Sequence, residues 1–285
     1  MNKDQLKKLA KDPKLISGIY NYCDRWCERC AFTSKCMTYA LSKDDVNDPR
    51  TQDITNKAFW DKLHEIFQVT FEMLKETADE MGIDLDAIDH EEAAKQQEQV
   101  HEIVKDQPYT KAAFSYAKMV DDWFKSNKKL IENKSDELIS LAQAQIPSIR
   151  PDKDALKIQD CLEVVRWYQH QIYVKLCRAS SGMIRGELAR PERGRRENNE
   201  YSPQDANGSA KVALIGIERS LAAWGEMLNQ FPEQENSILD LLVKLKRLLR
   251  QVETAFPDAR AFIRPGFDTA VSKRKMTRHR HRKTR

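Results

Sequence analysis

The stretch D152-KDALKIQDCLEVVRWYQHQIYVKLCR-A179 is the most apolar helical segment of the chain. Its apolar residues recur every three or four positions, which is the repeat of an α-helix. They also fall on two sides of that helix, and a helix that is apolar on both sides is usually covered by neighbours on both. The stretch therefore predicts the central helix of a bundle. One side carries Ile158, Cys161, Leu162, Val165, Tyr168, Ile172 and Leu176, and the other carries Leu156, Glu163, Trp167, His170 and Val174.

Helical repeats continue on both sides of this stretch, and only nine glycines and ten prolines interrupt 285 residues. We predict an all-α fold, a helical bundle of about seven to nine helices that forms a single domain over 1–268. A loop rich in Gly, Pro, Arg and Asn is expected at about 180–209, and a disordered tail at 269–285. A strong amphipathic helix that Gly82 ends is expected to bury one stripe, made of Phe59, Leu63, Ile66, Phe67, Thr70, Leu74, Ala78 and Met81.

The chain has no apolar run of the length that crosses a membrane, and its first residues, MNKDQLKK, have no apolar export segment. We therefore expect a cytoplasmic protein with no membrane contact. The net charge of +4 hides an asymmetry, because residues 273–285 carry eight Lys or Arg and no acid. Contact with nucleic acid or with an acidic partner is a possible role for residues 273–285.

Four of the six cysteines lie within fourteen positions, in Y20-NYCDRWCER-C30 and at Cys36. A helix beginning near Leu15 would place Cys23, Cys27 and Cys30 on one narrow face. A break at Thr33-Ser34 would then let Cys36 enter from the first turn of a second helix. We therefore expect Cys23, Cys27, Cys30 and Cys36 to act together as metal and cofactor ligands.

The surroundings of the four thiols suit a metal centre. Three cations, Arg25, Arg29 and Lys35, can offset the negative charge of four thiolates. Aromatic side chains can exclude water from the centre, namely Tyr20, Tyr22, Trp26 and Phe32.

The cysteine pattern is also compatible with chemistry other than a cluster. The four residues could be free core cysteines, whereas structural disulfides are less consistent with a cytoplasmic chain. Radical-SAM enzymes share C-x3-C-x2-C, but they usually have an aromatic residue where this chain has Arg29 and need strands that the sequence does not predict. Structural zinc sites usually take two separated cysteine pairs, whereas this run is compact. We therefore favour a [4Fe–4S] cluster over Zn, in a redox, sensing or binding role.

The segment CDRWCERC, followed by FTSKC, resembles a set of bacterial helical proteins that carry a CDRWCERC...FTxxC motif. The resemblance covers about twenty residues. It implies that the four cysteines form one unit, and it implies no activity.

Two alternative functions stay open at this point, and so does the question of whether the chain is an enzyme. In the first, zinc only pins the N-terminal helices of an adaptor whose tail binds nucleic acid or a partner. In the second, Glu163, His170 and Glu218 form a di-metal carboxylate site in the bundle. Such a site requires two Glu-x-x-His pairs, and the chain contains only Glu98-x-x-His101 and the near match Asp61-x-x-His64. The remaining cysteines, Cys161 and Cys177, are expected in the core.

Overall fold

A computed structural model describes residues 3–43, 49–188 and 203–268. Within these ranges the chain is all-α, with nine α-helices, several short 3-10 turns and no strand, so the predicted fold class is confirmed. None of the described helices combines the length and the apolar character that a membrane span requires. Contacts divide the chain into two compact units: the N-terminal unit, residues 1–87 with 263–285, and the bundle unit, residues 88–262. Our expectation of one domain over 1–268 stays a prediction.

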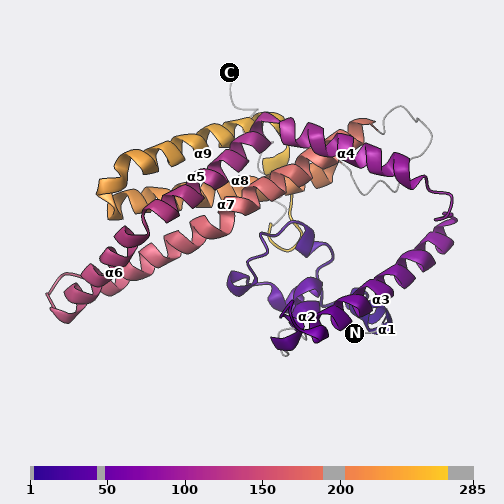
Figure 1. Cartoon of the computed structure of the whole chain (residues 1–285), viewed down its shortest axis with the longest axis horizontal. Coiled ribbons are helices and arrows are strands. Elements are labelled where there is room, and N and C mark those ends of the chain that lie inside the picture. The colour runs from indigo at the N-terminus through magenta and orange to yellow at the C-terminus, as the bar shows by residue number, and fades with distance from the viewer. Residues whose placement is uncertain (1–2, 44–48, 189–202, 269–285) are drawn as a thin grey trace, which may run out of the picture. The chain divides into compact units, whose positions relative to one another are not determined.

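The bundle unit is built around one long helix, α7. Figure 1 shows α5, α8 and α9 running lengthwise with α7, while α6 continues the direction of α5 and the first half of α7 runs back beside α6. The helices α5 and α8 contact α7, and α9 contacts both of them. The bounds are α4 His90–Asp106, α5 Pro108–Ser126, α6 Lys128–Gln143, α7 Pro151–Leu188, α8 Pro203–Gln230 and α9 Glu235–Ala255.

The burial of α7 was predicted correctly for only one of its two apolar sides. Val165, Ile172 and Leu176 are fully buried, as the first apolar side requires. On the second side Leu156 and Val174 are 66% and 57% exposed, so this side is not covered along its length. The helix also continues to Leu188 instead of ending near Ala179. Residues 180–188 of the expected loop are therefore helical, residues 203–209 belong to α8, and residues 189–202 lie outside the described residues.

The helices α7 and α8 approach each other closely because small residues face large ones. A Cβ added to Gly216 of α8 would lie 2.8 Å from Cδ1 of Tyr168 and 3.1 Å from Cγ1 of Ile172 on α7. One polar pair in this core joins α5 and α8, where the indole nitrogen of Trp224 donates to the hydroxyl of Tyr116 at 3.0 Å. Complete burial raises the pKa of Tyr116 to about 12, so this phenol stays neutral.

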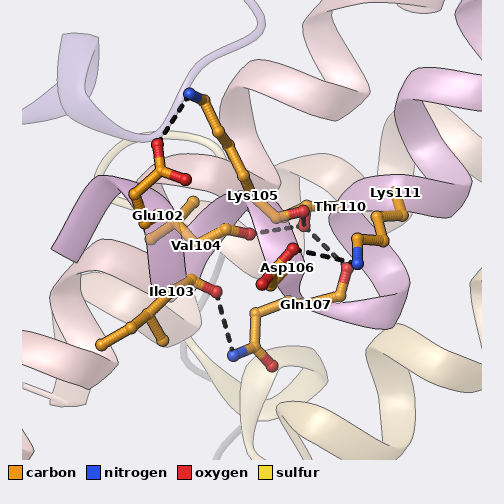
Figure 2. Close-up of polar contacts among 8 residues, drawn as sticks. All are labelled: Glu102, Ile103, Val104, Lys105, Asp106, Gln107, Thr110 and Lys111. Carbon is orange, nitrogen blue, oxygen red and sulfur yellow. Dashed lines mark hydrogen bonds and ion pairs between the residues drawn. The ribbon is translucent and has the colours of Figure 1, made fainter. Parts of the chain in front are cut away.

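The break between α4 and α5 follows from Pro108, which has no N–H to continue the helix and suits the first position of the next one. Figure 2 shows the side-chain hydrogen bonds to backbone carbonyls at the break. The hydroxyl of Thr110 donates to the carbonyl of Val104 at 2.6 Å and to that of Gln107 at 2.8 Å. Lys111 pairs with Asp106 at 3.0 Å on the surface.

The N-terminal unit contains three helices and much irregular chain. Its helices are α1 Lys3–Ala10, α2 Met37–Lys43 and α3 Lys57–Met81, and residues 263–268 return to it from the other end of the chain. Lys7 of α1 pairs with Glu76 of α3 at 2.8 Å. The prediction that α3 buries its apolar stripe was wrong for most of the stripe. Of its eight residues only Ala78 is buried, and Ile66, Phe67, Leu74 and Met81 are exposed.

The close approach of α7 and α8 can be tested at Gly216. We expect Gly216→Ala to lower the free energy of unfolding by about 1–3 kcal/mol, because the new methyl group overlaps Tyr168. Gly225→Ala on the same helix is the control, because nothing lies within 4 Å of its added Cβ. It should be neutral or raise stability by up to about 1 kcal/mol through helix propensity. Urea unfolding followed by far-ultraviolet circular dichroism measures both, and equal effects would contradict the packing described.

Candidate metal centre

The cysteine segment does not form the helix that we predicted from Leu15. Between Ala10 and Met37 the described chain makes three single 3-10 turns, at Ile19–Asn21, Cys27–Arg29 and Thr33–Lys35. Two residues with left-handed backbone interrupt any helix, Gly18 at φ 71° and Arg25 at φ 59°. The Asp24 carboxylate also accepts a hydrogen bond from the backbone N–H of Trp26 at 3.3 Å, a local contact that competes with a helix.

All four cysteines nevertheless line the same cavity. Cys23, Cys27, Cys30 and Cys36 border a small cavity of about 20 Å³ that is partly open to solvent. They arrive there because the chain folds back on itself, and not because they share a helical face. Cys36 comes closest to its expected position. It directly precedes α2 and its carbonyl accepts the first bond of that helix, from the N–H of Ala40 at 3.0 Å.

The cysteines influence one another electrostatically. Burial raises the pKa of the Cys27 thiol, and the neighbouring Cys23 and Cys36 raise it further. A second thiolate close to the first costs energy in the same way that any like charge does. A bound cation removes this cost, since a coordinated thiol is held in its deprotonated form.

Backbone groups also contact the sulfurs. The N–H of Phe32 donates to Sγ of Cys30 at 3.4 Å, and the thiol of Cys23 donates to the carbonyl of Tyr20 at 3.5 Å. An N–H that points at a sulfur stabilises thiolate charge. The bond made by Cys23 needs its proton and would be lost on ligation.

The expected cations are distributed unequally around the cavity. Arg25 lines it directly. The guanidinium of Arg29 instead lies over the ring of Trp26, 4.1 Å from its centroid, and Trp26 is itself part of the cavity wall. Lys35 is exposed and contributes its backbone carbonyl, which accepts from the N–H of Ile16 at 3.0 Å.

The aromatic wall was predicted in part. Tyr20, Trp26 and Phe32 line the cavity, and Tyr22 is not among the lining residues. Phe267 was not predicted as a lining residue. It comes from the C-terminal segment and contacts Phe32 edge to face at a centroid distance of 5.0 Å. Four further lining residues were not predicted either: Ile19, Asp24, Thr33 and Tyr39.

Gly266 allows the turn that brings Phe267 to the cavity. Its φ of 78° suits glycine, and an added Cβ would lie 2.9 Å from Cδ1 of both Ile16 and Ile19. The Pro265-Gly266 pair was the available signal. It indicates a turn, but a turn does not say which segment it will contact.

No three His, Cys, Asp or Glu side chains in the described part of the chain form a group that holds one metal ion as they stand. This also bears on the expected di-metal site. His170 is exposed, and the exposed Glu218 accepts from Arg260 at 2.7 Å, so the bundle does not gather these residues and Glu163 into one buried site. The pairs Glu98 with His101 and Asp61 with His64 are exposed on α4 and α3.

The two remaining cysteines belong to the bundle unit, and neither lines the cavity. Cys161 is buried, as predicted, and burial raises its pKa to about 11. Cys177 is half-buried and contacts the buried residues Val100, Val104 and Ile184. The basic tail lies outside the described residues, so its contact with nucleic acid or an acidic partner stays a prediction.

Comparison of the chain with models of protein families, with curated proteins and with solved structures finds no match.

The contact of the C-terminal segment with the cysteine segment can be tested at Gly266. In metal-free protein we expect Gly266→Ala to speed alkylation of the cysteines at 23–36, because the methyl group displaces Ile16 and Ile19. Gly82→Ala in the same unit is the control. It imposes the same backbone strain of about 1–2 kcal/mol at φ 67°, but its Cβ meets nothing within 4 Å. Peptide mass spectrometry gives the rates. Equal rates in both variants would show that the segment does not cover the cavity.

Proposed function

We propose that this protein carries one [4Fe–4S] cluster, held by Cys23, Cys27, Cys30 and Cys36, and uses it in electron transfer or in sensing. The observation that carries the proposal is the single cavity that all four cysteines line. The four cysteines are separated by irregular turns, so no common helix or strand places them near one another. Their common position is therefore most simply explained by a common ligand.

The chemistry of the donor set selects soft metals. Thiolates favour iron–sulfur clusters, zinc and copper(I) over magnesium or calcium. Zinc sites commonly use two cysteine pairs well separated in sequence, each on its own tight turn. Here one compact run supplies three cysteines and the fourth follows six residues later. This spacing supports a cluster of several atoms over a single ion.

The surroundings support the same choice. A cluster with four thiolates carries negative charge, and Arg25 at the wall with the Phe32 N–H on Cys30 would stabilise it. Aromatic and aliphatic side chains form most of the remaining wall, including the buried Ile19 and Trp26. They would limit the access of water to the cluster.

The number and exposure of the ligands indicate the kind of role. Four cysteines would complete the ligation of a cluster and leave no position for a substrate. The cysteines are also half-buried, so the cluster would lie close to the surface. A fully ligated cluster near the surface is suited to exchange electrons with a partner or to react to an oxidant.

The proposal is tested by purifying the full chain without oxygen. We expect brown protein with broad visible absorption and about four iron and four sulfide ions per chain. Bleaching by dithionite would add evidence for redox activity. Colourless protein with one zinc ion per chain would contradict the cluster and leave a structural zinc site. Protein with neither metal would contradict the proposal as a whole.

The ligand set is tested by single substitutions. We expect Cys23→Ser, Cys27→Ser, Cys30→Ser and Cys36→Ser each to lose most of the bound iron. Cys161→Ser and Cys177→Ser are the controls, since both cysteines belong to the bundle unit and neither lines the cavity. Iron and sulfide analysis compares the two groups. Equal losses in both would show that the ligands are assigned wrongly.

A further inference from the structure

The helix α3 presents large apolar side chains to solvent along most of its length. Trp60, Phe67, Phe71 and Leu74 are 53%, 63%, 63% and 54% exposed. Scattered exposed apolar residues are ordinary, but contiguous patches usually mark an interaction surface. Complete burial of one such side chain is worth about 1.5–3 kcal/mol, so covering all four would be strongly favourable.

These residues follow the spacing of a coiled coil. Positions 60, 64, 67, 71 and 74 alternate steps of four and three, which places them in one seam of a heptad repeat. We call them the α3 seam. Position 64 holds His64, which is also exposed.

The α3 seam faces away from the rest of its own unit. At 100° per residue, Met73 and Glu76 lie on the opposite side of the helix from Phe67 and Phe71. Met73 is half-buried, and Glu76 pairs with Lys7 of α1 at 2.8 Å. One side of α3 thus contacts α1, and the other side carries the aromatic residues.

The charges beside the seam indicate what covers it. Asp61, Gln68 and Lys75 directly follow the seam residues at positions 60, 67 and 74. The three therefore lie on the same side of the seam, with the uncharged Gln68 midway between the two charged residues. When a second copy of α3 runs antiparallel, this flank meets the same flank of its neighbour. Asp61 then faces Lys75 of the other copy, and the two-fold axis repeats the pair. Gln68 faces its own equivalent.

In the same register, the seam residues of the two copies pack against one another. Phe67 of each copy meets Phe71 of the other, and His64 meets Leu74. In a parallel arrangement the flanking pairs would be Leu63 with Gln68 and Thr70 with Lys75, which include no opposite charges. Parallel pairing would also place His64 against His64. The charges therefore favour the antiparallel arrangement.

We infer that α3 is a self-association surface, through which two copies of this chain form an antiparallel two-helix dimer centred on Gln68. The inference does not depend on the metal centre. It assigns a role to a helix that the proposed function leaves unused.

The first test is the mass of the full chain in solution by sedimentation velocity, over concentrations up to about 100 μM, where a micromolar dimer is well populated. We expect a dimer, and we expect Phe67→Glu and Phe71→Glu to be monomeric. Leu156→Glu is the matched control, because Leu156 is equally apolar and 66% exposed but lies on α7. It should remain dimeric. A monomeric wild-type protein would overturn the inference and leave the seam to another partner or to another part of the chain.

The second test addresses the register. Asp61→Lys and Lys75→Asp each place like charges opposite one another at two symmetric positions, and each should weaken the dimer about two- to tenfold. The double variant D61K/K75D restores opposite charges and should regain the wild-type dissociation constant. A second measurement at high salt should reduce all three differences. A dimer that responds to Phe67→Glu but shows no rescue in the double variant would overturn the antiparallel arrangement.

Discussion

The shared position of four cysteines around one cavity is the constraint on which the N-terminal unit depends. The chain between α1 and α2 has no regular structure longer than a single turn. Among its described residues, only Ile19 and Trp26 are large and buried. A segment with so little core cannot offset the entropy of ordering its backbone by apolar burial alone. A metal centre would supply that free energy, as it does in other small domains that fold around a metal.

The bundle unit has a different source of stability. Its core contains Trp224, Tyr116, Tyr168 and Phe231, all fully buried, and it has its own paired polar groups. Metal binding at the cysteines would therefore matter for one unit and not for the other. This division suits a protein that couples a redox or metal-dependent event in the N-terminal unit to a scaffold that remains folded.

The long helices could be predicted from the sequence because each repeats apolar residues with the helical period. Which of those residues are buried was predicted less well. The α3 stripe and the second side of α7 have helical spacing but largely face solvent. Apolar periodicity identifies one face of a helix, but it does not show whether another element packs against that face. The predicted helix through the cysteine segment does not form, for a local reason. Gly18 and Arg25 adopt left-handed backbone, and for Arg25 the residue type gives no warning of it. Phe267 could not be placed because its contact with Phe32 joins the two ends of the chain.

Whether the four cysteine sulfurs hold one iron–sulfur centre can be read from X-ray absorption at the iron edge of anaerobically purified protein. This measurement identifies the atoms bound to the metal. We predict about four sulfur neighbours around each iron and a second shell of iron atoms. Iron bound mainly by nitrogen and oxygen, with no iron neighbour, would contradict the cluster and its ligands.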